Sequence, residues 1–468
     1  MITRRDFMTI AALGLSGLAA GCVGQRAVPL GDRATDAFLD DVQSRAFRFF
    51  WDTTNPANGL ARDRFPTPSF ASMAAVGFAL TAYPIGASRG FVSRQAASER
   101  TLATLRFLAN APQGDAPTGM TGHKGFFYHF VDMERGARFE TTELSTVDTA
   151  LLLGGMLFAQ GYFDRPDELE IRELVEKIYA RVDWRWSQAR PPTVALGWSP
   201  EKGHLPYDWI AYSEAMLVYI LALGSPTHSL GPDSWKAWSA GLPKAWGTEE
   251  GFELVRFGPL FGHQYSHIWV DFRGIQDDFM RSKGLDYFEN SRRATLAQYA
   301  YAKRNPMGWT GYGPRLWGLT ACDGPADVTV EVQGRSRTFR SYSARGPGDF
   351  DDGTIAPTAV GGAVPFAPEH CIDALMAMRA DHGDNLYQQY GFLDSLNPSL
   401  PPTVPLKHGR HVLGRGWYDG DYLGIDQGPI LAMIENHRSG LVWDVMRQSP
   451  HIRRGLQRAG FAGGWLGA

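Results

Sequence analysis

Acidic side chains in one short stretch of the chain have the spacing needed for acid–base chemistry. Residues 139–155 read FETTELSTVDTALLLGG, so Glu140 and Glu143 stand just before a strongly apolar run. Ser145 is followed three residues later by Asp148, a pattern typical of a helix-capping box. The pattern predicts a helix that begins near Ser145 and leaves Glu143 at its mouth, where a carboxyl group can donate or accept a proton.

Other apolar segments also begin at an acid. Glu214 opens the segment at 213–223, Glu369 opens 368–378, and Asp426 precedes Pro429, which fits the first position of a helix. If these helices run parallel, their acids converge on one rim. Such a rim suits glycoside hydrolysis, in which one carboxylic acid protonates the leaving oxygen while a carboxylate activates water or attacks the anomeric carbon.

Each acid also has a structural explanation, because acids near helix N-termini cap the helix and stabilise its dipole. Asp148 fits this explanation best, since at about 100° per residue it lies about 140° around the helix from Glu143. Glu143 and Glu214, on neighbouring helices, form the better pair across a cleft. Glu140 could share a face with Glu143 if the turn between them is helical.

Residues 263–273 (HQYSHIWVDFR) place ligand-type side chains at i, i+4 and i+8, the spacing of a metal-binding face. A zinc protease pattern requires Glu directly after the first His, and Gln264 occupies that position. The favoured interpretation is therefore a polar, aromatic wall that hydrogen-bonds sugar hydroxyls. Its predicted members are His263, Gln264, Tyr265, His267, Trp269, Asp271 and Arg273.

Residues 349–353 (DFDDG) have some likeness to a calcium-binding loop. They lack the alternating ligands and the final Glu of an EF-hand loop. We expect a solvated loop that lends Asp352 to the site.

The helices that must position these groups are of two kinds. Amphipathic helices with one charged face are predicted at 40–51, 93–110, 166–186, 285–304 and 384–393. Segments that are apolar almost all round are predicted at 72–83, 145–158, 213–223, 263–272, 368–378 and 429–436. Six buried helices covered by amphipathic partners are what a closed double ring requires, so an all-α fold is predicted.

One β-rich insertion interrupts the helical pattern. Residues 327–332 and 335–339 flank Gln333-Gly334 and predict a hairpin, and residues 344–363 predict a long loop. No low-complexity linker divides the chain, which favours one domain over residues 38–468.

The first 22 residues have the pattern of an export signal. Arg4-Arg5 precedes a short apolar run, as in twin-arginine signals, and LAAGC ends at Cys22, which would be acylated. Residues 23–37 would then form a tether. An ordinary export signal, cleaved nearby without acylation, is the alternative. Both place the protein in the periplasm.

Composition limits the partners of the protein. The net charge of −3 argues against a nucleic-acid binder, which needs a basic face. Cys322 and Cys371 could pair in an oxidising compartment or remain two buried thiols. The 14 Trp, 17 Tyr and 27 Phe suit sugar stacking, although most of these rings must be core.

Several long motifs resemble the glycoamylase-like domain of glycoside hydrolase family 144. They run in the same order from about Phe38 to the C-terminus: GFFYHFVDMERG, ELSTVDTALLLGG, FGHQYSHIWVDFRGIQD, WTGYGPRLWGLTACDGP, DGTIAPTAVGGAVPFAPEH and YLGIDQGPILAMIENHRSGLVW. The resemblance implies an (α/α)6 barrel, an inverting β-1,2-glucanase activity that typically releases sophorose, and no cofactor.

The resemblance also assigns residues. Glu143 matches the acid most implicated in catalysis, with Glu140 as its acidic neighbour and Glu214 as an acid of the substrate site. Gly136 stands where the family has a further acid, which leaves the assignment of acid and base open. The motifs add Trp309, Arg315, Asp352, Glu369 and Asp426 as expected substrate contacts.

We therefore expect an exported glycosidase that cleaves β-1,2-glucan or a related β-glucan, in an endo manner, to sophorose or short oligosaccharides. The glucan is the expected partner, and a lipid on Cys22 is the expected membrane contact. One alternative is a glucan-binding lipoprotein without hydrolytic activity. Another is a transglycosylase or lyase, in which Tyr265 and His267 could act.

Overall fold

The computed structural model describes residues 32–467, so the predicted export signal and Cys22 lie outside the described residues. The last part of the predicted tether is helical instead, because α1 (Asp32–Thr53) begins earlier than the sequence indicated. Its first turns are held in place by the ion pair between Asp36 and Arg438. None of the helices in residues 32–467 combines the length and apolar character that crossing a bilayer requires.

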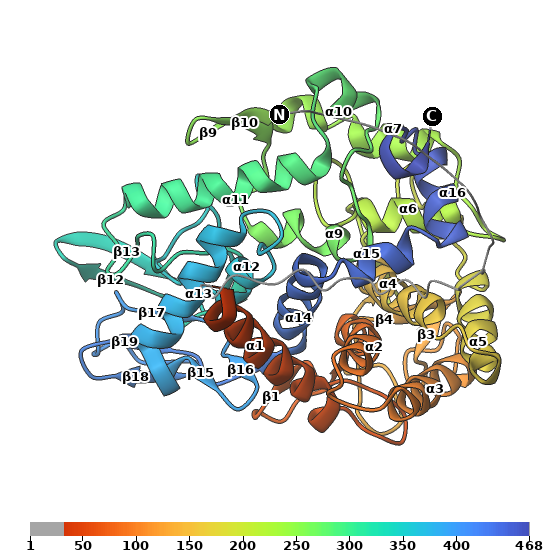
Figure 1. The fold of residues 1–468 in the computed structure, drawn as a ribbon, viewed down its shortest axis with the longest axis horizontal. Coiled ribbons are helices and arrows are strands. Elements are labelled where there is room, and N and C mark those ends of the chain that lie inside the picture. Colours follow the sequence, from red (N-terminus) through yellow and green to blue (C-terminus); the bar gives the residue numbers. More distant parts are fainter. Residues whose placement is uncertain (1–31, 468) are drawn as a thin grey trace, which may run out of the picture.

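Buried helices lie around the middle of the molecule, as Figure 1 shows. They are apolar on all sides because other helices cover every face; in α2, residues 73–86 are all buried. Neighbours in this ring pack against one another, and α14 contacts α2, α9 and α12. The helices are α2 (Met73–Ser88), α4 (Thr146–Tyr162), α6 (Met216–Gly224), α9 (Tyr265–Trp269), α12 (Pro357–Gly361) and α14 (Gly424–Arg438).

Amphipathic helices cover this ring from outside. α1 packs on α2 and α14, α3 on α2, α5 on α4, α13 on α12 and α16 on α6. Besides α1, the covering helices are α3 (Arg94–Asn110), α5 (Leu169–Ala180), α11 (Tyr287–Arg304), α13 (Pro368–His382) and α16 (Pro450–Arg458). Shorter helices are α7 (Asp233–Ser239), α8 (Leu242–Ala245), α10 (Asp278–Lys283), α15 (Leu441–Met446), η1 (Pro166–Glu168), η2 (Leu260–His263), η3 (Gly383–Asn385) and η4 (Gly464–Leu466).

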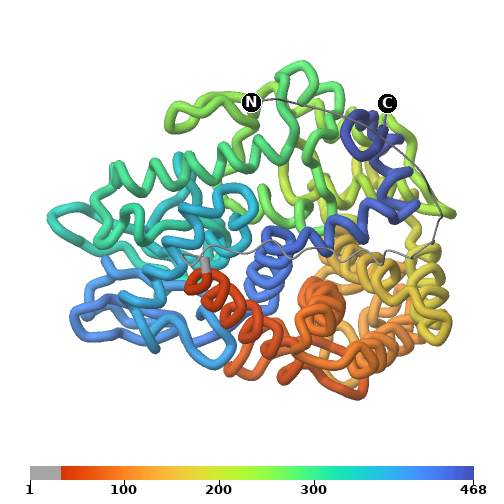
Figure 2. The backbone as a smooth tube through the Cα atoms, in the orientation of Figure 1, coloured from red at the N-terminus to blue at the C-terminus, as the bar shows by residue number. Residues whose placement is uncertain are grey.

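Two segments from opposite ends of the described chain lie side by side, α1 in red and α14 in blue (Figure 2). The buried Glu435 of α14 joins them, because it accepts a hydrogen bond from Gln43 Nε2 at 2.9 Å. The same carboxylate pairs with Arg89 Nε, at the end of α2, at 2.6 Å. One carboxylate thus ties three helices together.

Glycines let α2 and α4 approach closely. A Cβ atom on Gly155 would lie 2.0 Å from the carbonyl oxygen of Gly77, and one on Gly77 would lie 2.5 Å from the carbonyl oxygen of Leu151. No side chain fits in that space. The small residues of these apolar helices therefore fix the distance between two walls of the ring.

The helical class is confirmed, but the sequence predicted too few strands. Small antiparallel sheets edge the helices, and the widest has the order β3-β4-β6-β7-β8. Its members are β3 (Gly122–His123), β4 (Phe126–Tyr128), β6 (Leu144–Ser145), β7 (Gly197–Ser199) and β8 (Gly203–His204). Since β6 leads directly into α4, this sheet holds the entrance of that helix.

The predicted hairpin is confirmed as β12 (Val328–Val332) and β13 (Arg335–Phe339), with positive φ at both turn residues, Gln333 and Gly334. The other strands are β1 (Arg64–Phe65), β2 (Ala71–Ser72), β5 (Phe130–Val131), β9 (Trp246–Glu249), β10 (Phe252–Val255), β11 (Ala321–Asp323), β14 (Tyr342–Ala344), β15 (Tyr387–Gln388), β16 (Gly391–Phe392), β17 (Leu396–Asn397), β18 (Arg410–Val412), β19 (Gly416–Tyr418) and β20 (Tyr422–Leu423).

Three element predictions were wrong. Residues 384–393 form the β15–β16 hairpin rather than an outer helix. The helix at 368–382 is an outer one with an exposed face, and the buried helix at this place is α12, inside the predicted long loop. Pro429 is the sixth residue of α14 rather than the first, so Asp426 lies in the first turn.

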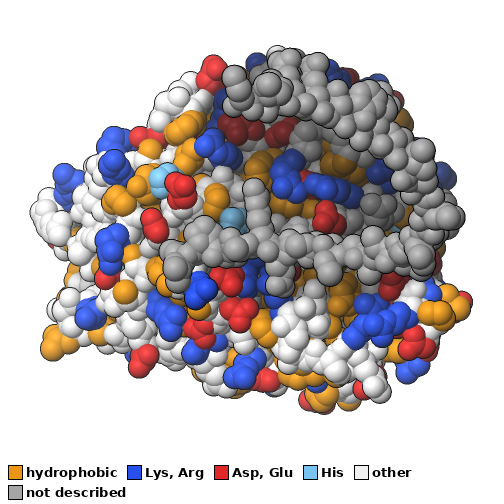
Figure 3. Space-filling view, viewed as in Figure 1, with side chains coloured by type: hydrophobic (Ala, Val, Ile, Leu, Met, Phe, Trp, Pro, Cys, Tyr) orange, Lys and Arg blue, Asp and Glu red, His pale blue; other side chains and the backbone are white. Residues whose placement is uncertain are grey.

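Cys322 and Cys371 are buried free thiols, so the predicted alternative of two unpaired cysteines is correct. On the face drawn in Figure 3, acidic and basic side chains are interspersed among the visible described residues.

Candidate active site

His129 and Glu143 face each other across two paired strands. Tyr128 of β4 pairs with Leu144 of β6, and the next residue pair is joined by a hydrogen bond from His129 N to Glu143 O at 2.9 Å. Their side chains also meet, with Nδ1 of His129 2.9 Å from Oε1 of Glu143. Nε2 of the same ring lies 3.5 Å from Oδ1 of Asp148. The imidazole therefore lies between two carboxylates.

The cap of α4 orients the second carboxylate. Ser145 Oγ accepts a hydrogen bond from Asp148 N at 3.1 Å, which confirms the predicted helix start. The hydroxyl also donates to Oδ2 of Asp148 at 2.5 Å and leaves Oδ1 toward His129. The capping residues thus also orient the site.

The three groups shift one another's pKa values. Burial alone would lower the pKa of His129, but the charge of Asp148 and the contact with Glu143 raise it to about 9. Burial would raise the pKa of Glu143, but the hydrogen bond and charge of His129 hold it below its usual value. At neutral pH the imidazole is therefore protonated and Glu143 is ionised.

The pKa of Glu214 is shifted in the opposite direction to that of Glu143. It lies just before α6, where Ser266 Oγ donates to its carbonyl oxygen at 2.8 Å and accepts from Leu217 N at 3.1 Å. Burial, with a contribution from the charge of Asp148, raises the pKa of Glu214 to about 7. A substantial fraction of Glu214 is therefore protonated at neutral pH.

Tyr265 is influenced by acids at the entrances of three inner helices. Burial raises its pKa, and the charges of Asp426, Glu214 and Asp148 raise it further. Its hydroxyl lies 3.5 Å from the carbonyl oxygen of Ile425, which has no helical donor because Pro429 lacks an N–H. The convergence of these acids on one rim stays a prediction.

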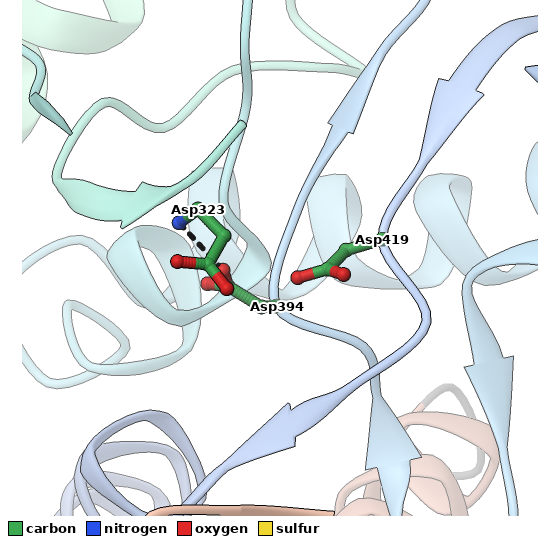
Figure 4. Close-up of side chains that lie close together, drawn as sticks. All are labelled: Asp323, Asp394 and Asp419. Carbon is green, nitrogen blue, oxygen red and sulfur yellow. Dashed lines mark hydrogen bonds between the residues drawn. The ribbon is translucent and has the colours of Figure 1, made fainter. Parts of the chain in front are cut away.

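A second group of acids continues from this rim. Arg64 pairs with Asp323 at 2.6 Å and with Asp63 at 3.2 Å. The backbone N–H of Asp323 donates to Oδ2 of Asp394 at 2.7 Å, and Asp419 points toward both side chains (Figure 4). Ligand oxygens of Asp323, Asp394 and Asp419 all lie within 4.8 Å of one another, a spacing that could hold a metal ion.

Burial raises the pKa values of several acids in this second group. It raises the pKa of Asp426 to about 7, and burial together with the charge of Asp426 raises the pKa of Asp394 well above its usual range. Burial and the charge of Asp394 raise the pKa of Asp419 likewise.

A cavity of about 760 Å³ opens beside these acids. Phe70 in its wall packs against Phe130 and Phe139, with ring centroids 4.2 and 4.6 Å apart, and Phe130 stacks on His129 at 3.8 Å. Two rings, Phe70 and Phe130, therefore connect the cavity wall to His129, and neither His129 nor Glu143 lines the cavity itself. Its lining is Arg64, Pro66, Thr67, Phe70, Asp323, Leu406, Lys407, His408, Gly409, Arg410, Asp419, Gly420 and Asp421, a mixture of polar groups and one aromatic face that suits a sugar.

The predicted wall at 263–273 is mostly core, so that prediction was wrong for its buried members, and Tyr265 stays a predicted substrate contact. Both ring nitrogens of the buried His263 are occupied, by Tyr212 Oη and Phe257 O at 3.1 Å each. Other members also have core partners: Gln264 donates to Ala359 O, His267 contacts Ser291, Trp269 donates to Thr81, and Asp271 pairs with Arg273 and Arg447. A metal at His263 and His267 does not fit these bonds.

Other predicted contacts lie apart from the site. Glu140 is exposed and makes no hydrogen bond within residues 32–467. Glu369 is exposed on the outer helix α13, and Arg315 pairs at the surface with Asp381. Trp309 is buried under Arg337. Asp352 is fully buried against Arg345 instead of lying on a solvated loop.

Sequence reasoning missed several residues of the site: Asp63, Arg64, His129, Asp323, Asp394 and Asp419. A signal existed for some of them. His129 directly follows the apolar triplet of β4, and Asp419 lies in the run WYDGDYLGID before the buried helix α14. Strand pairing and loop packing bring them together, and neither is visible as a local period.

Comparisons with known proteins agree with this architecture. Residues 206–450 match the Glycoamylase family model, described as "Putative glucoamylase". A solved structure described as a "putative glucoamylase" from Bacteroides uniformis is 30% identical with a TM-score of 0.78, covering 94% of this chain and 100% of that one. The endo-β-1,2-glucanase of Chitinophaga pinensis, solved with sophorotriose and glucose, is 27% identical with a TM-score of 0.76, covering 92% of this chain and 99% of that one.

A curated relative is the exo β-1,2-glucooligosaccharide sophorohydrolase (non-reducing end) of Parabacteroides distasonis, 27% identical over 458 residues and 90% of this chain. The chain spans 58% of the length of that relative. The family resemblance predicted from the motifs is confirmed. With more than half of its residues matched by the family model, the chain belongs to the glycoamylase-like family.

Proposed function

We propose that the protein is a glycoside hydrolase that cleaves β-1,2-glucan in an endo manner and releases sophorose or short oligosaccharides. The observation that carries the proposal is that two acids just ahead of the neighbouring helices α4 and α6 have pKa values shifted in opposite directions. Glu214 has a pKa of about 7, while His129 holds the pKa of Glu143 low. Two acids whose environments separate their pKa values are what acid and base roles require. The β-1,2-glucan activities named for two relatives support the choice of substrate.

In the proposed mechanism Glu214 is the general acid and Glu143 the general base. Glu214 gives its proton to the glycosidic oxygen as the bond to the anomeric carbon breaks. Glu143 takes a proton from a water molecule that attacks the opposite face of that carbon, so the anomeric configuration inverts. The charge of His129 keeps Glu143 ionised and its ring fixes the direction of Oε1.

The fold is proposed to be an (α/α)6 barrel. The ring is assigned to α2, α4, α6, α9, α12 and α14, and the covering helices to α1, α3, α5, α11, α13 and α16. Parallel inner helices would place Asp148, Glu214 and Asp426 at one mouth of the barrel. Residues 38–468 are proposed to form a single catalytic domain.

The product profile tests the proposed function. Linear β-1,2-glucan should give oligosaccharides and sophorose, while β-1,3-, β-1,4- and β-1,6-glucans should give none. NMR of the first products should show the α-anomer, because inversion of a β-linkage produces it. Sophorose alone from the earliest times would contradict endo action, and binding by calorimetry without product would favour a glucan-binding protein.

His129→Gln should lower kcat/KM by about a hundredfold, because the general base loses the group that orients it. Without the imidazolium the pKa of Glu143 rises, so the acidic limb of the kcat/KM profile should move to higher pH. The limb moves in this direction because the general base acts only when it is ionised, and activity is lost when it takes up a proton. A series of initial rates from pH 4 to pH 9 measures both effects.

His123→Gln is the matched control, since His123 stacks on Trp198 at 4.7 Å and contacts no carboxylate of the site. It should leave the acidic limb in place. An unchanged limb in His129→Gln would contradict the role given to His129.

For location, we propose export by the twin-arginine route and a lipid anchor on Cys22, supported by the sequence pattern of residues 3–22. Cell fractionation tests this, because Cys22→Ser should move the exported protein from the membrane to the soluble periplasmic fraction.

A further inference from the structure

The carboxyl groups of Asp323, Asp394 and Asp419 lie together in a buried cluster. The three residues have 4%, 1% and 1% exposure. Arg64 pairs with Asp323 and approaches Asp421, but in the described part of the chain no basic side chain pairs with Asp394 or Asp419. Ionised carboxylates at such burial are normally paired or bound to a metal, and otherwise they take up a proton.

One oxygen in this cluster has no partner. Asp394 uses Oδ2 for the backbone N–H of Asp323, and Asp419 uses Oδ1 for the backbone N–H of Gly420 at 2.6 Å. The Asp394 side chain also shares a hydrogen bond with the Asp426 carboxyl group, whereas Oδ2 of Asp419 is buried without a hydrogen bond. Figure 4 shows the Asp419 carboxylate aimed at the other two. Orphaned acceptors at such burial cost free energy unless a cation or donor reaches them.

The donor atoms indicate which class of cation fits. The three ligand oxygens lie within 4.8 Å of one another, which one hard divalent ion can span. Calcium accepts irregular sets of oxygen ligands at about 2.3–2.6 Å, whereas magnesium demands near-octahedral geometry at about 2.0–2.1 Å and usually keeps several waters. Hard carboxylate oxygens without nitrogen or sulfur also favour this class of ion.

The cavity reaches two of the three acids. Asp323 and Asp419 line the 760 Å³ cavity, and Asp394 is not part of its lining. Because the ligand oxygens of all three acids lie within 4.8 Å of one another, an ion that enters through the cavity can contact Asp394 as well. We propose that Asp323, Asp394 and Asp419 bind a calcium ion at the floor of this cavity.

The proposed ion would join segments distant in sequence. Asp323 ends β11, Asp394 precedes β17, and Asp419 lies between β19 and β20, just ahead of α14. Crosslinking these loops by one ion should stabilise the folded state, because the ligands come together only after folding. The proposal is independent of which glucan the enzyme cleaves.

Calcium binding to the intact protein tests the proposal. After dialysis against a chelator, calorimetric titration with CaCl2 should show one site, and calcium should raise the Tm by several degrees. MgCl2 should bind more weakly. Asp419→Asn should lower calcium affinity about tenfold or more, because affinity follows the number of charged ligands. Asp394→Asn should lower calcium affinity by a similar factor. If Asp394→Asn fails to fold, Asp419→Asn, whose side chain lies at the cavity wall, still tests the proposal.

Asp421→Asn is the matched control. Asp421 lies in the same loop but accepts from Thr67 N and approaches Arg64, so its loss should weaken calcium binding far less than loss of Asp419. Absence of binding at millimolar CaCl2 would overturn the proposal. So would equal affinity in wild type and Asp419→Asn, or a Tm increase with sophorose and none with calcium. Calcium affinity and Tm are measured without turnover. A protein that binds calcium but cleaves no glucan would therefore support the calcium site and refute only the proposed function.

Discussion

Glu214→Gln should reduce kcat on linear β-1,2-glucan by about a thousandfold, the typical contribution of a positioned general acid. The amide has nearly the same shape as the carboxyl group, so the helix entrance and the hydrogen bonds of Ser266 to the backbone should persist. What is lost is the proton that the leaving oxygen needs. A reducing-sugar assay gives kcat, and circular dichroism shows whether the fold is retained.

The pH dependence of activity provides a second test of Glu214 as the general acid. Glu214 acts in its protonated form, and its pKa of about 7 is raised by burial. Activity of the wild type should therefore fall as pH rises through about 7, while His129, with a pKa of about 9, is still protonated. Glu214→Gln should lose this alkaline limb, because the group that causes it is gone.

Leaving-group chemistry separates an acid from a base. An aryl β-sophoroside with an activated phenol needs little protonation to depart, so Glu214→Gln should hydrolyse it with a much smaller loss than it shows on glucan. Glu143→Gln should be equally impaired on both substrates. Glu134→Gln, at an exposed acid outside the site, is the control and should keep full activity. If Glu214→Gln retained a tenth or more of kcat, Glu214 would not be the general acid, and Asp426 would be the next candidate.

The sequence located the helix entrances better than it located their partners. Ser145 and Asp148 predicted the start of α4 because a cap is a local pattern, read from residues three apart. Glu143 and Asp148 were separated by the helical angle, and they do not contact each other directly. His129 lies between them, and it comes from a neighbouring strand whose pairing the sequence did not reveal.

Polar residues at helical spacing were the main source of error. His263, Gln264 and His267 have the residue types of a binding wall, yet each hydrogen-bonds to a core partner distant in sequence, respectively Tyr212, Ala359 and Ser291. A period identifies a helix face but not whether that face meets solvent, substrate or another helix. The sequence did not predict the short helix α12, because five residues show too little periodicity to distinguish a helix from a loop.

Asp352→Ala should destabilise the protein by about 3–5 kcal/mol, the usual cost of removing one partner from a buried ion pair. Both side chains are fully buried, and Arg345 binds Asp352 through two bonds, Nε to Oδ1 at 2.7 Å and Nη2 to Oδ2 at 2.9 Å. The variant would leave a guanidinium without its counter-charge in the interior. Urea unfolding followed by tryptophan fluorescence measures the change in the free energy of unfolding.

The matched control is the exposed pair of Arg315 and Asp381, for which Asp381→Ala should leave the free energy of unfolding almost unchanged, because water and salt screen a surface pair. A double change, Arg345→Met with Asp352→Leu, removes the buried charges but should remain destabilised. Arg345 also donates to Cys322 O at 2.7 Å, and Asp352 accepts from Thr354 N at 3.1 Å, so the double variant strands these backbone groups. Full recovery in the double variant would mean that the buried charges alone, and not this hydrogen-bonded network, account for the destabilisation.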